Sequence, residues 1–213
     1  AIVPWILLAM GLAGAPLAHA GVATHEVLES DAAKKWSFSI SDFTYLVPDD
    51  KNYTQPTLTA DHDWFHFEAR YNYEGLQTGS AWLGYNLGGG EKITWEFTPM
   101  AGAVFGLTRG VAPGCRLTLE WNKLAFYSET EYVIDVRDTP ANFLYTWLEL
   151  TYAPWDWLRA GLVAQRTRDF ESGLGVDRGV LVALTWRQMD FTTCVFNVGW
   201  EKPTVVLGVA LHF

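Results

Sequence analysis

The sequence has few charged residues, only two cysteines and no excess of basic residues. Charged residues make up 18% of the 213 positions, and 24 acids against 15 bases give a formal net charge of −9. Nucleic-acid binding needs a basic surface that neutralises phosphates, so this charge balance argues against it. Hydrophobic residues make up 49% of the chain and aromatic residues 15%, which excludes a disordered or collagen-like protein.

Long apolar runs are also missing, except for one near the beginning. After Gly21 no stretch approaches the ~18 consecutive apolar residues of a transmembrane helix. The exception, residues 2–12, is followed by Ala18-His19-Ala20, a small-x-small pattern typical of signal-peptide cleavage. Glycines and a proline interrupt this run before it reaches the length of a membrane span. We therefore expect residues 1–20 to be a signal peptide truncated at its start, and residues 21–35 to be a short periplasmic extension.

The rest of the chain alternates apolar and polar residues. Between residues 64 and 73, Phe65, Phe67 and Tyr71 alternate with His66, Glu68 and Arg70. A period of two predicts a β-strand with one apolar face, whereas a helix would scatter these charges around its circumference. Segments of this kind recur along the chain and are separated by clusters of Gly, Pro, Asn and Asp, which predicts an all-β protein.

These segments predict one antiparallel β-barrel over residues 36–213, with twelve strands and ten as the alternative count. The segment at 53–60 is the weakest, because Pro56 cannot donate a ladder hydrogen bond and favours an edge or a bulge. Five short turns then fall at one end of the barrel and the longest loops, including 106–113 and 169–177, at the other, as in bacterial barrels. The predicted strands are residues 36–47, 53–60, 64–73, 78–87, 92–105, 114–121, 124–135, 143–153, 157–168, 178–187, 190–199 and 203–213.

The apolar faces carry aromatic residues near the strand ends. Trp36, Tyr73, Trp155 and Trp186 are examples. Aromatic girdles of this kind mark the two interfaces of a membrane barrel, so the pattern indicates that lipid covers the outside. A soluble periplasmic β-sandwich, which alternates in the same way, is the alternative.

The last strand carries a more specific feature. It places large apolar residues at every second position before the carboxyl-terminal phenylalanine, and it resembles the signal by which bacterial outer-membrane β-barrel proteins are recognised by their assembly machinery. The resemblance covers nearly all of the chain after residue 20. It implies location in the bacterial outer membrane, with the lipid bilayer and the assembly machinery as partners, but no family of known activity. The residues of this assembly signal are Val205, Leu207, Val209, Leu211 and Phe213.

The polar faces of the predicted strands would line the barrel interior. Acids and bases nearly balance there, so we expect pairing across strands, because an unpaired buried charge is costly. The same side chains would set selectivity if the interior is open to water. Twelve strands lie between filled eight-stranded barrels and open channels of 16 to 18 strands, so we expect a narrow lumen. The predicted lumen residues are His66, Glu68, Arg70, Lys92, Glu96, Arg116, Glu120, Glu129, Glu131, Glu149, Arg159 and Arg187.

The cysteines, Cys115 and Cys194, fall on predicted strands that lie far apart in a barrel. A disulfide needs Cα atoms within about 7 Å, which this topology does not supply. We therefore expect two free thiols.

The function that the sequence favours is a narrow passive pore for small polar solutes. One alternative is a closed structural barrel whose outer loops bind surface polymers or proteins, and another is a surface lipid-modifying enzyme. The chain has no Gly-x-Ser-x-Gly elbow, and His62 and His66 lie ~13 Å apart along a strand, too far to share a metal ion. We therefore predict no catalytic residue, metal or cofactor.

Overall fold

The computed structural model describes residues 36–137, 142–169, 173–200 and 202–213, and these residues form one β-barrel. No helix in these ranges is long and apolar enough to cross a membrane. The predicted signal peptide at 1–20 and the predicted extension at 21–35 lie outside the described residues.

Strands β4 and β5 together make one strand of the barrel, so the sheet of 13 strands closes as twelve. Both pair with β6, and Asn86 interrupts them. The strands are β1 Ser37–Leu46, β2 Tyr53–His62, β3 Phe65–Tyr71, β4 Thr78–Tyr85, β5 Leu87–Gly89, β6 Thr94–Gly106, β7 Gly110–Trp121, β8 Leu124–Asp135, β9 Phe143–Trp155, β10 Leu158–Asp169, β11 Gly173–Trp186, β12 Met189–Phe196 and β13 Thr204–His212.

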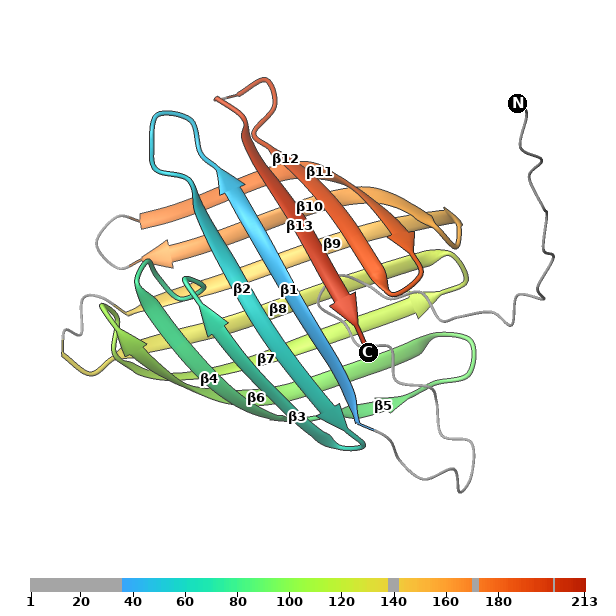
Figure 1. Ribbon diagram of the computed structural model, residues 1–213, viewed down its shortest axis with the longest axis horizontal. Helices are drawn as coiled ribbons and strands as arrows, with labels where there is room; N and C mark the ends of the chain where they lie inside the picture. The colour runs from blue at the N-terminus through green and yellow to red at the C-terminus, as the bar shows by residue number, and fades with distance from the viewer. Residues whose placement is uncertain (1–35, 138–141, 170–172, 201) are drawn as a thin grey trace, which may run out of the picture.

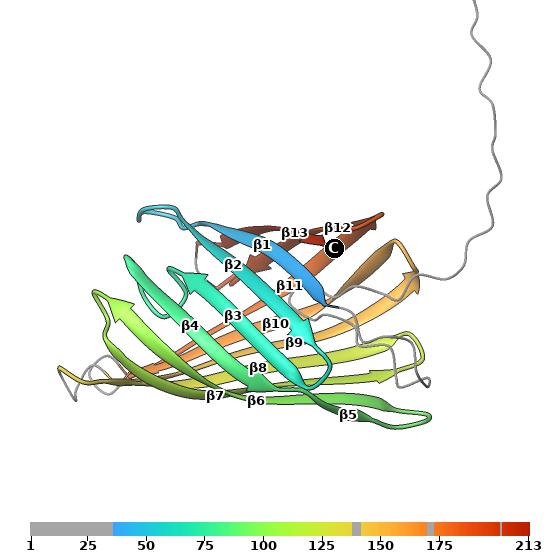
Figure 2. The same ribbon diagram turned by 60° about the horizontal axis from the view of Figure 1, so that its bottom comes forward.

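The barrel closes where the first strand meets the last. In Figure 1 the blue β1 lies beside the red β13, and Figure 2 shows the same neighbours from a second side. The two strands pair in register from Ser39 with His212 to Leu46 with Val205. Phe38 and Phe213 extend this seam, because each backbone N–H donates to the carbonyl of the other at 2.8 and 2.9 Å. All other pairings join strands that follow one another in the chain, which confirms the predicted antiparallel barrel.

The predicted second strand is present despite its proline. Pro56 lies within β2 and pairs with Asp42 of β1. The ladder between β2 and β3 begins only at Thr57, so Pro56 lies just beyond its end. The missing N–H is therefore tolerated away from the β2–β3 ladder, and the chain needs no edge strand there.

The two rims of the barrel differ. We call the end that holds the tight turns the turn rim. Asp63, Asn122 and Arg187 each begin a two-residue connection there with a φ of 56 to 58°, the left-handed conformation that such hairpins use. The start of β1 and the end of β13 lie at this rim. Its connections are residues 63–64, 90–93, 122–123, 156–157 and 187–188. At the opposite end, the loop rim, lie the connections 47–52, 72–77 and 107–109, together with residues 136–137, 142, 197–200 and 202–203.

Two predicted outer loops are shorter than expected. β6 and β7 continue into the segment predicted as the loop 106–113 and leave only 107–109 between them. β11 begins at Gly173, inside the predicted loop 169–177. In both cases the alternation of faces continues, since Val111 and Val176 remain exposed on the outside. The glycines in these two segments led to the prediction of loops, but the residues pair with neighbouring strands instead.

The outside of the barrel is apolar and ends in an aromatic belt at the turn rim. Leu83, Leu162 and Val180 are 59%, 60% and 51% exposed, because side chains at every second position point away from the interior. An apolar surface of this extent requires a lipid environment rather than water. Trp155 and Trp157 stack at 5.6 Å between ring centroids. The exposed tryptophans at the turn rim are Trp36, Trp64, Trp95, Trp121, Trp155, Trp157 and Trp186.

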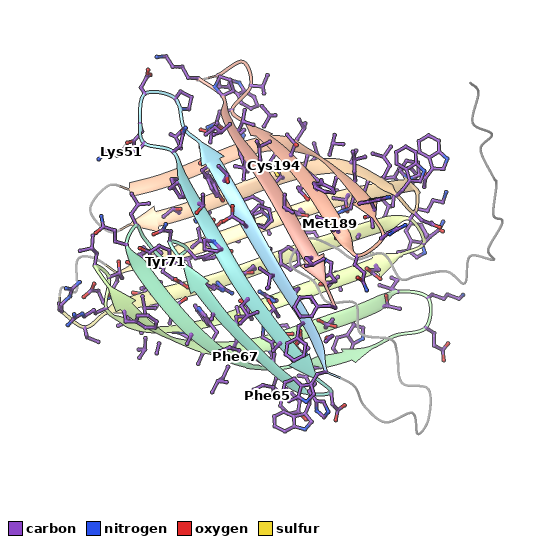
Figure 3. All side chains as sticks on the ribbon, in the orientation of Figure 1. Lys51, Phe65, Phe67, Tyr71, Met189 and Cys194 are labelled. Carbon is purple, nitrogen blue, oxygen red and sulfur yellow. The ribbon has the colours of Figure 1, made fainter. Side chains whose placement is uncertain are left out.

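The two cysteines lie on opposite faces of the barrel wall and are free, as predicted. Cys194 of β12, labelled in Figure 3, is buried in the interior, whereas Cys115 pairs with the outward-facing Pro99 of β6. We expect reductant to leave the electrophoretic mobility of the barrel unchanged. We also expect alkylation of the unfolded chain without reductant to modify both thiols. Alkylation of neither thiol until reductant is added would contradict this topology.

Candidate functional site in the barrel lumen

A cluster of charged side chains begins on the inner face of β3. His66, Glu68 and Arg70 point inward, whereas Phe65 and Phe67, labelled in Figure 3, belong to the half-buried outer face. Glu68 is fully buried, and Arg70 is 4% exposed. Charged groups at this burial need partners, because the interior solvates them poorly.

Arg70 has one partner on its own strand and two on the other side of the lumen. Its Nε donates to Glu68 Oε2 at 2.6 Å on its own strand. Its Nη1 lies 2.9 Å from Glu129 Oε1 and 3.1 Å from Glu131 Oε2, both on β8. Between β3 and β8 the wall contains β4, β6 and β7, so these ion pairs cross the interior rather than join adjacent strands.

Arg116 of β7 joins the same cluster. Its guanidinium forms ion pairs with Glu68 and, at 3.2 Å, with Glu129 Oε2. Tyr127 donates its hydroxyl to the same Glu129 oxygen at 2.6 Å. Each of these carboxylates therefore bridges two arginines, which ties three parts of the wall together.

His66 extends the cluster toward the turn rim. Its Nδ1 lies 2.6 Å from Asp61 Oδ1, and its Nε2 lies 2.8 Å from Glu68 Oε1. Asn86, which interrupts β4 and β5, donates from Nδ2 to Asp61 at 2.8 Å and accepts from Thr98 at 2.7 Å. The break in that strand thus places an amide side chain where it fixes the carboxylate.

The loop between β3 and β4 completes the cluster at the loop rim. Glu74 is 2% exposed and accepts from Ser80 Oγ at 2.6 Å and from Trp82 Nε1 at 3.0 Å. The guanidinium carbon of Arg70 lies 4.4 Å from the ring centroid of Tyr73 and 4.8 Å from that of Trp82. Two aromatic faces thus hold the cation. Burial raises the pKa of the Tyr73 hydroxyl well above its ordinary value, so the ring stays neutral.

Sequence reasoning missed Glu74 and Trp82, and it placed Tyr73 on the lipid-facing side, whereas the Tyr73 ring lies inside against Arg70. It assigned residues 74–77 to an outer loop, and nothing local shows that this loop turns inward. The available signal was Gly102 opposite Trp82, because a Cβ at Gly102 would lie 2.5 Å from the indole ring. A glycine directly across from a large aromatic residue indicates that the ring lies flat against the wall. We call the whole set the Arg70 cluster; it comprises Asp61, His66, Glu68, Arg70, Tyr73, Glu74, Trp82, Arg116, Tyr127, Glu129 and Glu131.

A second, smaller ion pair lies on β9 and β10. Arg159 Nη1 is 3.8 Å from Glu149 Oε2, and Trp147 donates from Nε1 to Glu149 at 2.9 Å. Both charged residues are buried. Glu96 and Glu120 also face inward, at the turn-rim end of β6 and β7.

Two of the predicted lumen residues lie elsewhere. Lys92 belongs to the exposed connection 90–93, because β6 begins only at Thr94. Arg187 begins a tight turn with a positive φ, is exposed, and lies over the Trp186 ring at 5.3 Å. The polar periodicity was extended two residues before β6 at Lys92 and one residue beyond β11 at Arg187, so these two residues do not line the interior.

The expected near-balance of acids and bases also needs correction. The inward-facing acids outnumber the inward-facing arginines, because several acids outside the predicted set point inward. Glu74 Oε2 and Glu131 Oε1 are buried without a hydrogen-bond partner, and so are Nη2 of Arg70 and the three guanidinium nitrogens of Arg159. Against Arg70, Arg116 and Arg159, the described interior holds Asp61, Glu68, Glu74, Glu96, Glu120, Glu129, Glu131, Asp135, Glu149, Asp177 and Asp190.

Two clusters of buried hydrophobic residues also lie in the interior, and each shares one member with the Arg70 cluster, Tyr127 in the first and Trp82 in the second. The first also includes Leu181 and Phe196, and the second Met100 and Val133. The charged residues extend as a file from Glu120 at the turn rim, through the Arg70 cluster, to Glu74 at the loop rim. We call this arrangement the charged file. Within the described residues, no group of His, Cys, Asp and Glu is arranged to hold a metal ion.

Comparison with known proteins shows structural likeness without sequence likeness. No protein-family model and no curated protein sequence matches the chain. Among solved structures, the barrel is similar to the KdgM porin, with a TM-score of 0.59, 11% identity, and coverage of 82% of this chain and 99% of that one. A structure described as KdgM porin in complex with disordered oligogalacturonate gives a TM-score of 0.60 at 12% identity, with the same coverage of both chains. The chain therefore has the fold of the outer-membrane β-barrel porins, which confirms the predicted class.

Proposed function

We propose that this barrel is a narrow passive pore in the outer membrane for small polar solutes, that the charged file is its path, and that it prefers cations. The observation that carries the proposal is the pairing of Arg70 on β3 with Glu129 and Glu131 on β8. These contacts make the Arg70 cluster the constriction of the path. The porin fold and the apolar exterior support a membrane pore, and the charges inside support selectivity by sign.

The preference for cations follows from the excess of carboxylates. Rings of acidic side chains favour cations, because the local potential is negative and concentrates them. Buried carboxylate oxygens without hydrogen-bond partners, at Glu74 and Glu131, lie along the charged file. Oligogalacturonate, the ligand named for one structural neighbour, carries many carboxylates, and this acid-rich interior disfavours a solute of that kind.

The hydrophobic clusters favour a second candidate, a closed structural barrel. Trp82, Leu181 and Phe196 are almost completely buried inside, so much of the cross-section is filled by side chains. In this candidate the loop rim would act by binding surface polymers or proteins. The short connection at 107–109 leaves it less surface than the sequence predicted.

Single-channel recording separates these candidates. We expect the purified barrel in planar bilayers to give unitary steps that grow with KCl concentration, and a reversal potential in a salt gradient that shows cation preference. Replacing Glu74 and Glu131 together with glutamine should reduce that preference, because two partly unsatisfied charges are removed. Glu91→Gln, in an exposed connection at the turn rim, is the matched control.

Three outcomes would contradict the proposal. Anion preference in the parent barrel would reject the assigned sign. Absence of current from a barrel whose folding is verified by heat-dependent mobility would favour the closed candidate. If Glu68→Ala, Arg70→Ala and Arg116→Ala all left the conductance and selectivity of a conducting barrel unchanged, the Arg70 cluster would not be its constriction.

A further inference from the structure

One acidic residue lies on the lipid-facing surface of the barrel. Asp42 of β1 pairs with Val209 of β13 and with Pro56 of β2, and both of these residues are exposed on the outside. Ile40 and Leu46, which share its face of β1, are exposed there as well. Among the strand residues whose side chains the structure describes, Asp42 is the one acid that faces outward.

The depth of Asp42 places it within the hydrocarbon core. It follows Trp36 of the turn rim by six positions. With a rise of about 3.3 Å per residue and a strand tilt of about 40°, it lies roughly 15 Å from Trp36 along the barrel axis. The apolar band of such barrels is about 25 Å tall. An ionisable side chain at this depth is costly to expose to lipid, so we expect it to have a protein partner.

The carboxylate of Asp42 receives little support from its own chain. Thr44 donates from its hydroxyl to Asp42 Oδ2 at 3.1 Å. Within the described ranges, no base forms an ion pair with Asp42. Thr54 of β2, directly opposite Thr44, adds an exposed hydroxyl to the same surface. We call Asp42, Thr44, Thr54 and Pro56 the acidic face; it offers a carboxylate to a positively charged donor.

The complementary charge lies on another part of the outer surface. Arg166 of β10 and Arg178 of β11 are exposed and share their faces with the outward-facing Leu162 and Val180. Arg178 pairs with Ala164, so Arg166 is its diagonal neighbour, about 7–8 Å away. Neither arginine forms an ion pair in the part of the chain that the structure describes. We call these two arginines the basic face.

The two faces cannot meet within one barrel. β12 and β13 lie between β11 and β1 (Figure 1). The ladders lead from Asp42 across β13 and β12 to Leu184 of β11, which is six positions from Arg178. This offset alone amounts to about 20 Å along the strand. An ion pair between the two faces therefore requires two copies of the chain.

The two faces nevertheless lie at similar depths in the membrane. Arg178 is eight positions from Trp186 of the turn rim. By the same geometry it lies roughly 20 Å from that rim along the barrel axis, compared with roughly 15 Å for Asp42. The long, flexible arginine side chain covers the remaining difference of about 5 Å. Two barrels inserted in the same direction can therefore bring the two charges together.

We propose that the acidic face of one barrel binds the basic face of a second copy of this chain in the membrane, with Asp42 paired to the partner's Arg178. An arginine and a carboxylate form parallel hydrogen bonds, and their attraction is strong where lipid replaces water. The contact is head-to-tail, so each copy keeps one face of each kind for further copies. An anionic lipid would neutralise the basic face but leave Asp42 without a partner, whereas a second copy satisfies both faces.

Energy transfer between two fluorescently labelled populations tests this contact in lipid vesicles. Mixed donor-labelled and acceptor-labelled parent barrels should show transfer at a low protein-to-lipid ratio. Asp42→Asn and the double variant R166Q/R178Q should each lower the transfer at least several-fold, because each lacks one face. A mixture of donor-labelled Asp42→Asn and acceptor-labelled R166Q/R178Q should recover much of it, because the first keeps the basic face and the second keeps the acidic face.

The matched controls are Asp156→Asn and Arg187→Gln. Each removes a charge of the same sign from an exposed connection at the turn rim and should leave the transfer unchanged. If Asp42→Asn or R166Q/R178Q does not fold, Asp42→Leu or R166L/R178L takes its place, because leucine suits a lipid-facing position. The same loss and the same recovery in the mixture are then required.

Three results would overturn the proposal. The first is absence of transfer between parent barrels. The second is a mixture that transfers no more than either variant alone. The third is loss in Asp42→Asn together with full transfer in R166Q/R178Q, which indicates a two-fold contact between acidic faces. Conductance of a single barrel depends on its lumen, so failure of this test is distinguishable from failure of the proposed pore.

Discussion

Replacing Arg70 with alanine is expected to have the largest effect on both stability and conduction. Arg70 is 4% exposed and is held by Glu68, Glu129 and Glu131. Removing one partner of a buried ion pair costs about 3–5 kcal/mol, because the remaining charges stay buried without compensation. The free energy of unfolding, measured by denaturant titration in lipid vesicles, should fall by that amount.

The same substitution should raise the unitary conductance and strengthen the cation preference. The guanidinium that crosses the lumen is removed, while the carboxylates that it neutralised remain. The conductance and cation preference of Arg70→Lys should lie between those of the parent and Arg70→Ala. An ammonium group keeps the charge but lacks the planar guanidinium that donates hydrogen bonds to several carboxylates at once. Arg187→Ala, which removes an exposed arginine at the turn rim, should change neither quantity.

A double variant shows whether the loss comes from uncompensated charge. Adding Glu131→Gln to Arg70→Ala removes one of the stranded carboxylates, so the pair should be less destabilised than the sum of the single changes. Strict additivity, or a conductance in Arg70→Ala no larger than in the parent, would show that Arg70 does not bridge the lumen in the membrane.

Replacing Phe213 with alanine is expected to impair assembly of the barrel. The Phe213 ring lies 5.9 Å from that of Phe38, and the two backbones exchange hydrogen bonds at the seam between β1 and β13. An aromatic pair contributes about 0.5–1.5 kcal/mol beyond its buried area, which corresponds to as much as about a tenfold change in a closing equilibrium. If the outward face of β13 is also the assembly signal, the loss in cells should exceed the loss in vitro.

The measurement compares refolding into vesicles with the amount of folded barrel in outer membranes. Phe105→Ala is the matched control, because it removes an exposed phenylalanine that also faces outward but lies away from the seam. We expect Phe213→Ala to reduce both the refolding yield in vesicles and the amount of folded barrel in outer membranes. The control should change both quantities only slightly. If Phe213→Ala lowers neither refolding nor membrane assembly, the role assigned to this residue is wrong.

The strands were predictable because membrane barrels expose their periodicity. The outer face must be apolar in lipid, so alternation along β3 and β13 indicated their register, including the inward direction of His66, Glu68 and Arg70. Strand ends were less predictable, because the alternation of polar and apolar residues does not stop where the hydrogen-bond ladder stops. Lys92 and Arg187 were misplaced for this reason.

The partners of the charged residues were not predictable from the sequence. Arg70 and Glu131 are 61 positions apart, and their contact depends on which walls of the barrel approach each other across the lumen. No local pattern encodes that distance. The inward fold of Glu74 is a further case, because its burial depends on Ser80 and Trp82 of the following strand.

The tryptophan belt fixes the barrel's depth from one side only. Indole rings prefer the membrane–water interface and resist displacement toward either water or the hydrocarbon core. The tryptophans therefore hold the turn rim at a constant depth in the membrane. The loop rim lacks a comparable ring among the described residues and has arginines there, whose long side chains can reach for headgroups over a range of depths. In a thicker or thinner bilayer we therefore expect the hydrophobic mismatch to be accommodated at the loop rim. The turn rim should keep its depth relative to the membrane–water interface.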